Sequence, residues 1–558
     1  MAPAVGTLRS IASSFVHVLV WVMKTGRAAK NSAVNLLLLA LGALFFALGF
    51  PNFVADWGLA PFAWISLVPV AILIHRIPWW SSPLWGALYG YATYALFNYW
   101  LATFNPVSFI LVPTIYAGWF FIVFPLLKIA DLAFKRYAYL AQTLIWIAFE
   151  IVKTKGFLGY AYGVLGYSQY GWRSLIAIAD IFGVMGVSIL VVFSSFLIAA
   201  YLLESGFVSN DPGLDPIRRR NRPGRRFRVS AIIWAVLILA ANIYGISSKV
   251  DYSKSGKWRP ALIQHNVNTW LTGIDAWRQS LNSLVEESKK ALKEKPDALV
   301  WSETSFVPSI EWHRKYRRQR DRMALINSLM SFLQDVNIPV IIGNNDSVME
   351  GGKKLDYNAT LLFDGGEIID KYRKIHLVPF SEHFPYAGLF PRLMEYIQAQ
   401  GTPLYTKGVE FTTFALDRWG GPRVSTLICF EDTFGYLARN FTLAGAEILV
   451  NTSNDSWSTA AACAIQHQNM AIFRAVENRR SMIRATTSGI TCVIDPNGRT
   501  TARLDPFEQG NLVAEVPIYT GRKTIYSRFG DWFEKLILIL ALPTLIAALV
   551  LIAKRKSR

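Results

Sequence analysis

Long apolar runs alternate with short polar segments over the first half of the chain, and one more such run follows near its end. A helix rises about 1.5 Å per residue, so about 20 apolar residues are needed to cross the hydrocarbon core of a bilayer. Eight runs reach or approach that length, at about 33–50, 58–75, 83–102, 108–130, 138–154, 174–203, 230–247 and 534–552. The second and fifth runs are short, so the pattern predicts eight membrane-spanning helices, with seven as the alternative.

From Trp258 onward the pattern changes to short apolar runs separated by helical periodicity. The strand-like runs include PALIQHNV, DALVWSE, IPVIIGNN and RVSTLICF, and helical patterns cover Ala276–Lys293 and Arg320–Asp335. The segments DGG at 364–366 and DPNG at 495–498 are typical of hairpin turns. Short strands that alternate with helices favour an α/β layered domain.

Composition supports a membrane protein. Of the 558 residues, 53% are hydrophobic and only 17% are charged, and the mean hydropathy is +0.29. A soluble protein of this size could not easily bury so much apolar surface, whereas a membrane protein need not bury it. The three cysteines (Cys429, Cys463 and Cys492) are too few for a disulfide framework and have no CxxC spacing for zinc.

The net charge of +19 predicts an orientation in the membrane. Basic residues between 24 and 30, the loop RRRNRPGRRFR and the terminal KRKSR all fall on one side if there are eight spans. Cytoplasmic loops carry such an excess of Lys and Arg, so both termini are predicted to be cytoplasmic. Lys153, Lys155 and Arg173 are exceptions on the outward side. The basic loop could also be a nucleic-acid patch, but topology already explains it, and no nucleic-acid partner is predicted.

Three parts follow from these patterns. Residues 1–250 are predicted to be a membrane domain of about seven spans, 251–530 an outward-facing catalytic domain, and 531–558 a last span with a basic cytoplasmic tail. The run 11–23 is too short to span a membrane, and no A-x-A cleavage site closes it. We interpret it as an interfacial helix or an uncleaved signal-like segment.

Two strands of the outward domain end on reactive side chains. DALVWSE reaches Glu303 and VSTLICFED reaches Cys429 where each apolar run stops, and DKYRKIHLVPFSE between them carries Lys374. Ligands gather at strand ends in layered α/β folds. A carboxylate can take a thiol proton, and an ammonium can stabilise both the thiolate and an oxyanion. The set suffices for acyl transfer, although Cys429 alone would be interpreted as a core residue.

The motifs resemble those of a known family. WSE (301–303), YRKIHLVPFSE (372–382) and ICFED (428–432), in this order, resemble the Glu–Lys–Cys triad segments of the nitrilase superfamily. Together with the apolar runs, the chain resembles the bacterial apolipoprotein N-acyltransferases. Further similar segments are GYSQ (166–169), YNAT (357–360), NTSNDSW (451–457), QHQNMAIFRAVENRR (466–480) and RATTSGIT (484–491). The resemblance implies a four-layer αββα sandwich on a base of about eight transmembrane helices.

The resemblance also implies residue roles. Glu303 would be the general base, Lys374 the ammonium that stabilises the oxyanion, and Cys429 the nucleophile. The supporting residues would be Glu382, Phe430, Glu431, Asn358, Trp457 and a tryptophan that matches Trp270 or Trp277, with Trp270 favoured. The chain departs from the family pattern at Ser381, where glycine is usual, at Phe430, where tyrosine is frequent, and in the loop SWSTAAACAIQH.

By the same resemblance, the thiolate of Cys429 would take an acyl chain from a membrane phospholipid as a thioester. The α-amino group of the diacylglyceryl-cysteine of an apolipoprotein would then accept it in a ping-pong scheme. This is the last step of bacterial lipoprotein maturation, placed at the outer face of the cytoplasmic (inner) membrane. No cofactor is implied, and the scattered His376, His383 and His467 give no metal-ligand spacing.

Two other functions stay open from the sequence alone. A membrane-anchored nitrilase-type amidase would use the same triad but would have no need of eight spans. A transporter with an outward binding domain is the other alternative, but the spans contain few charged residues and show no repeat.

Overall fold

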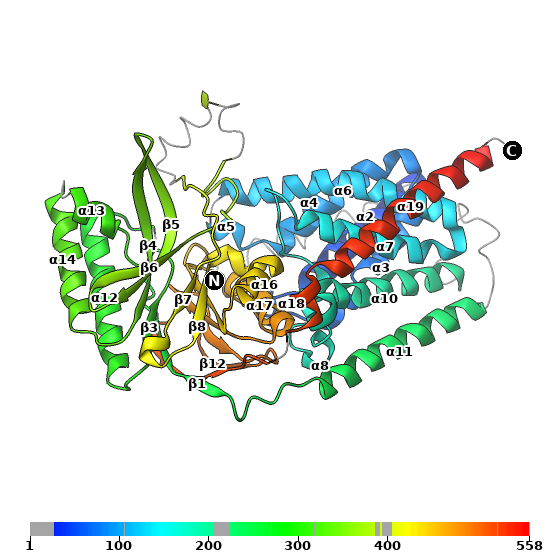
Figure 1. The fold of residues 1–558 in the computed structure, drawn as a ribbon. Coiled ribbons are helices and arrows are strands. Elements are labelled where there is room, and N and C mark those ends of the chain that lie inside the picture. The colour runs from blue at the N-terminus through cyan, green and yellow to red at the C-terminus, as the bar shows by residue number, and fades with distance from the viewer. Residues whose placement is uncertain are drawn as a thin grey trace.

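The computed structural model describes residues 27–104, 106–205, 224–268, 270–316, 319–384, 391–392, 404–521 and 523–556. The apolar run 11–23 and most of the basic loop between the sixth and seventh runs lie outside these residues. The chain forms a helical bundle, on the right of Figure 1, and an α/β part, on the left.

Most apolar runs become helices of the bundle, which lie lengthwise beside one another (Figure 1). The long helices are α2 (Arg27–Leu48), α3 (Leu67–Arg76), α4 (Ser82–Phe97), α6 (Pro106–Phe134), α7 (Ala138–Lys153), α10 (Val184–Glu204), α11 (Arg225–Ser247) and α19 (Trp532–Lys556). Short helices join them: η1 (Ala60–Ile65), α5 (Leu101–Phe104), α8 (Arg173–Ile176) and α9 (Ala179–Phe182).

Several of these helices are long and apolar enough to cross a membrane. Within the described residues there are five such stretches: Asn31–Leu48, Val107–Lys153, Val184–Glu204, Arg225–Ser247 and Trp532–Arg555. The predicted run 58–75 lies in a shorter apolar stretch, Ala60–Arg76. The helices therefore support a membrane protein, while the number of eight spans stays a prediction.

The predicted run 174–203 is not one helix. The structure divides it into α8, α9 and α10, and Gly183 lies between the last two with φ of 65°. This left-handed conformation is open to glycine at little cost and ends α9. The break leaves the two short helices at the end of the bundle that meets the α/β part.

The α/β part contains two six-stranded sheets. One sheet has the order β13-β2-β3-β4-β5-β6, with β13 (Gly510–Val513), β2 (Pro260–Gln264), β3 (Ala298–Trp301), β4 (Val340–Glu350), β5 (Lys353–Asp364) and β6 (Glu367–Arg373). The other has the order β12-β11-β10-β9-β8-β7, with β12 (Thr500–Leu504), β11 (Thr491–Ile494), β10 (Ser481–Thr486), β9 (Ile448–Ser453), β8 (Arg423–Ile428) and β7 (Thr413–Ala415). A short ribbon pairs β1 (Gly256–Trp258) with β14 (Val516–Ile518).

Helices cover the outer faces of the two sheets (Figure 1). α12 (Ile274–Leu292), α13 (Ile310–Tyr316) and α14 (Arg320–Gln334) lie on the first sheet, and α16 (Gly435–Leu443) and α17 (Ala461–Asn478) lie between the second sheet and the bundle. Alternate residues of a strand face opposite ways. On β3, Val300 therefore joins the core between the sheets, and Leu299 joins the core beneath α12 and α14.

Strand pairing decides where the reactive residues lie. β2, β3 and β4 are parallel, as are β8, β9 and β10, so the carboxyl ends of each set meet at one edge of its sheet. Both predicted hairpin turns are confirmed, because β5 pairs antiparallel with β6 and β11 with β12. Glu303 and Cys429 follow β3 and β8 at these edges.

The α/β part meets the bundle through α17 and the residues after it. Buried polar contacts cross this boundary: Gln466 with Trp100, Arg474 with Tyr167, and Arg479 with Asp180. The GYSQ segment thus meets the QHQNMAIFRAVENRR segment in space. The two parts are joined by buried charges as well as by apolar packing.

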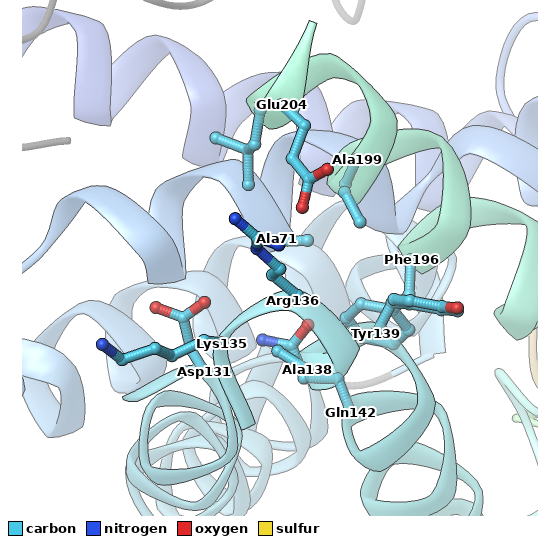
Figure 2. Close-up of a pocket in the computed structure, with 12 residues that line it drawn as sticks. Ala71, Asp131, Lys135, Arg136, Ala138, Tyr139, Gln142, Phe196, Ala199 and Glu204 are labelled. Carbon is cyan, nitrogen blue, oxygen red and sulfur yellow. The ribbon is translucent and has the colours of Figure 1, made fainter. Parts of the chain in front are cut away.

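A hollow at the other end of the bundle is lined by charged side chains. Figure 2 shows Asp131, Lys135, Arg136 and Glu204 around it, and Glu204 is the last residue of α10, far from the α/β part. Only about 20 Å³ of this hollow is wide enough for a water-sized solute. That is room for about one water molecule.

Candidate active site

Cys429 lies at a sharp turn directly after β8. It is the first residue of the short helix η8 (Cys429–Thr433), and its φ of 49° is in the left-handed region. Such a backbone is uncommon for a residue other than glycine and is typical of functional sites. Cys429 as a whole residue is half-buried.

Glu303, Lys374, Glu382 and Asn358 form a buried polar cluster. The Lys374 Nζ lies 3.2 Å from Glu303 Oε1 and 2.9 Å from Glu382 Oε1. The Asn358 Nδ2 donates to the same two oxygens, at 2.8 and 2.9 Å. The structure therefore brings together the predicted base, the predicted ammonium and two of the supporting residues.

Both charged neighbours act on the thiol. Burial raises the pKa of Cys429 well above its usual range, the Glu303 carboxylate raises it further, and the Lys374 ammonium lowers it. Burial alone would lower the pKa of Lys374, but the two carboxylates outweigh it and raise that pKa well above its usual range. Cys429 is thus a neutral thiol that feels both a carboxylate and a cation, and a thiol in this state needs a base before it can act as a nucleophile.

Glu431 joins the lysine segment to the cysteine segment. Its carboxylate accepts hydrogen bonds from the backbone N–H groups of Ile375, His376 and Ile428 and from the Tyr372 hydroxyl. Two of these donors follow Lys374 and one precedes Cys429, so one side chain holds both segments. Burial raises the pKa of Glu431 to about 7, and the N–H donors act against that rise.

Three aromatic side chains lie where the loop after β9 meets the bundle. The rings of Trp270 and Trp457 are 5.2 Å apart, and the Phe104 ring lies 6.0 and 6.2 Å from them. Both tryptophans are exposed, by 52% and 37%, so the cluster offers apolar surface to a ligand. Trp277 lies on α12 beneath the Arg322 guanidinium, and the match of Trp270 to the family's tryptophan stays a prediction.

Phe430 and Ser381 keep local contacts despite departing from the family pattern. The Phe430 ring stacks 6.5 Å from the Tyr160 ring of the bundle and 5.0 Å from the Phe434 ring. The Ser381 hydroxyl donates to the Pro379 carbonyl at 3.4 Å. Phe430, the residue after Cys429, therefore packs against the bundle.

Two family models match the chain. The model of the carbon-nitrogen hydrolases covers residues 259–526, and that of the apolipoprotein N-acyltransferase N-terminal domain covers residues 42–197. Apolipoprotein N-acyltransferase 1 of Treponema denticola is 39% identical over 92% of this chain and 96% of its own length. The protein of the same name from Treponema pallidum is 37% identical over 94% and 97%.

The chain belongs to the apolipoprotein N-acyltransferase family. It is therefore an acyltransferase, with a nitrilase-like domain in its second half. The resemblance drawn from the motifs is confirmed over nearly the full length. A carbon-nitrogen hydrolase from Helicobacter pylori G27 also matches in structure, with 16% identity and a TM-score of 0.35 over 47% of this chain and 89% of that one.

One buried cluster in this family member was missed by the sequence interpretation. The cluster consists of Asp432, Asp455, His467 and Arg484. Each aspartate contacts both the histidine and the arginine. All four lie within the quoted segments ICFED, NTSNDSW, QHQN and RATTSGIT. Their presence in four separate motifs was the signal, but nothing in the spacing showed that they meet.

Among the residues that the structure describes, no three His, Cys, Asp or Glu side chains are grouped to hold a metal ion. The Nδ1 atom of His376 lies 3.0 Å from the Tyr436 hydroxyl. His467 lies between two carboxylates that also bind Arg484.

Proposed function

We propose that this chain transfers a fatty acyl chain from a membrane phospholipid to the α-amino group of the diacylglyceryl-cysteine of an apolipoprotein. The acyl chain would be carried as a thioester on Cys429. The observation that carries the proposal is the Cys429 thiol on its strained turn, facing Glu303 and Lys374, in a chain of the apolipoprotein N-acyltransferase family.

The first half-reaction acylates the enzyme. Glu303 takes the proton of the Cys429 thiol, and the sulfur attacks the ester carbonyl of the phospholipid. The carbonyl oxygen becomes an oxyanion that the Lys374 ammonium stabilises. The intermediate then collapses: the ester C–O bond breaks and the new C–S bond remains as the thioester. The leaving alkoxide takes the proton from Glu303 and departs as lysophospholipid.

The second half-reaction releases the acyl chain as an amide. The amino group of the acceptor attacks the thioester carbonyl, a C–N bond forms and the C–S bond breaks. Glu303 takes a proton from the nitrogen, and the thiolate is protonated again. Glu382 and Asn358 keep the base and the ammonium in place, since both share the Glu303–Lys374 cluster.

The surroundings fit two lipid substrates. The exposed Trp270 and Trp457, together with Phe104, would contact the acyl chain where the site meets the bundle. We further propose an αββα sandwich seated on eight spans in the bacterial inner membrane, with the catalytic domain on the periplasmic side. The basic residues around the far hollow, Lys135 and Arg136, agree with a cytoplasmic location for that end.

Intact-mass analysis tests the proposal. The purified chain, incubated in detergent with phosphatidylethanolamine, should gain the mass of one acyl group that hydroxylamine removes. Cys429→Ala should gain none, and Cys492→Ala, which removes a buried thiol of β11, should behave as the wild type. An acyl adduct that persists in Cys429→Ala would contradict the thioester assignment.

The match to the N-terminal domain of the apolipoprotein N-acyltransferases speaks against the amidase alternative. A soluble amide substrate would need neither the exposed aromatic cluster nor a site built against apolar helices. Release of ammonia from small amides in the absence of lipid, without any acyl adduct, would support it instead.

A further inference from the structure

The four buried side chains behind the cysteine turn form a closed ring. Asp432 Oδ1 lies 2.7 Å from His467 Nε2, and His467 Nδ1 lies 2.9 Å from Asp455 Oδ1. Asp455 Oδ2 lies 3.2 Å from one terminal nitrogen of Arg484, and the other terminal nitrogen contacts Asp432 Oδ2. Each member thus contacts the two others of opposite charge.

The ring is fully enclosed and electrically balanced. Asp432 and Arg484 are 0% exposed, His467 is 3% exposed and Asp455 is 8% exposed. Buried charges are costly unless each is paired. With both imidazole nitrogens facing carboxylates, a doubly protonated His467 and Arg484 match the two aspartates.

The ring links four segments that are separate in the sequence. Asp432 belongs to η8, the helix that begins at Cys429, and Asp455 belongs to the loop after β9. His467 comes from α17 and Arg484 from β10. The ring therefore ties the turn of the nucleophile to the loop that carries Trp457.

The last residue of β9 and the loop after it contact three parts of the site. A hydrogen bond with the Ser453 hydroxyl lowers the pKa of the Cys429 thiol. The same hydroxyl lies 3.0 Å from Asp455 Oδ1. The Asn454 backbone N–H donates to Glu303 Oε2 at 3.1 Å. A displacement of Asp455 would therefore reach the nucleophile, the base and the aromatic cluster together.

The geometry points to the Asp432–His467–Asp455–Arg484 ring as a positioning element that holds Cys429, Glu303 and Trp457 in register for acyl transfer. The inference rests on the proposed function and adds residues that act through others without touching the substrate. Small displacements matter, because a shift of about 1 Å can cost about 100-fold in rate.

Gly489 gives the ring a second, independent test. A Cβ at this glycine would lie 2.2 Å from Asp455 Oδ2, so the backbone approaches the ring more closely than any side chain allows. Gly489→Ala keeps all four charges and forces Asp455 to move. Gly118→Ala is the matched control, since a Cβ there meets nothing within 4 Å.

The first experiment measures the rate of acyl-enzyme formation in His467→Gln and Gly489→Ala. Acyl-enzyme formation from phosphatidylethanolamine should slow about tenfold or more in both, while Gly118→Ala and His313→Gln, a buried histidine of α13, keep the wild-type rate. Equal rates in folded ring variants and wild type would overturn the ring proposal alone. A wild type that forms no acyl-enzyme would instead overturn the proposed function.

The second experiment separates positioning from plain structural support. Alkylation of Cys429 by iodoacetamide is followed against pH through the mass of its peptide. The charged groups that act on this thiol are Glu303, Lys374 and Asp455. Loss of the His467 cation leaves more of the Asp455 charge acting on the thiol, so the alkylation midpoint should rise. A folded His467→Gln with an unchanged midpoint and only a lower melting temperature would show a structural role and refute positioning.

Discussion

Replacing Lys374 with methionine is the sharpest test of the buried polar cluster. The Lys374 side chain is 1% exposed, and its ammonium lies within 3.2 Å of two carboxylates. Methionine keeps much of the volume but removes the positive charge. The negative charges of Glu303 and Glu382 then have no counter-ion, and only the Asn358 amide still donates to both. Removing one partner of a buried ion pair costs about 3–5 kcal/mol.

That cost predicts a measurable loss of thermal stability. For a domain of this size each kcal/mol lowers the unfolding midpoint by about 2–4 °C, so Lys374→Met should melt about 6–20 °C below the wild type in detergent. Acyl-enzyme formation should fall below detection, because the oxyanion loses its cation. Scanning fluorimetry and intact-mass analysis measure the two effects.

A double substitution checks the cause. Lys374→Met combined with Glu382→Gln removes one of the two uncompensated carboxylates and should melt above Lys374→Met alone, while staying inactive. The coupling between such neighbours is about 0.5–3 kcal/mol. Lys257→Met is the control, since its pair with Glu515 is 60% exposed or more and contributes little. A Lys374→Met chain that melts within about 2 °C of the control would refute the reasoning, because that difference corresponds to at most about 1 kcal/mol.

Further outcomes follow from other parts of the site. Burial alone would lower the pKa of His467, but the neighbouring carboxylates raise it to about 9. The protonated form of His467 therefore contributes about 3 kcal/mol to the free energy of unfolding. This contribution is complete below pH 6.5 and is lost as pH rises through 9. The melting curves of the wild type and of His467→Gln should therefore converge above pH 9. Trp270→Ala should slow acylation by long-chain phospholipid more than by a short-chain ester, whereas Trp277→Ala should change neither rate. Glu431→Gln puts an NH₂ group where a backbone N–H needs an acceptor, so it should lower stability by about 1–3 kcal/mol, seen as a lower melting midpoint.

The sequence predicts the site where a local pattern ends on a reactive residue. Glu303 and Cys429 each follow an apolar strand, and strand ends are where an α/β fold exposes side chains. Lys374 and Glu382 lie eight residues apart around a stiff proline segment, so their proximity was foreseeable. The family motifs then assigned the roles that periodicity alone left open.

Other features depend on contacts that no local pattern carries. The ring of Asp432, Asp455, His467 and Arg484 exists because β8, β9 and β10 run parallel and α17 packs over them. Its members are up to about fifty residues apart, so only the sheet register brings them together. The division of the run 174–203 at Gly183 was also missed, because hydropathy does not register one left-handed residue.

The buried contacts between α17 and the bundle have a consequence for how this enzyme can be handled. Arg479 is neutralised by Asp180 and Arg474 donates to Tyr167, so two arginines of the α/β half rely on partners from the membrane half. A fragment that begins at residue 251 would leave the Arg479 guanidinium without its counter-ion Asp180. It would also expose the apolar surface next to this arginine to water. The α/β half therefore does not form a complete domain without the membrane half, because helices of the bundle complete its interior. The enzyme consequently remains attached to the membrane in which its lipid substrates lie.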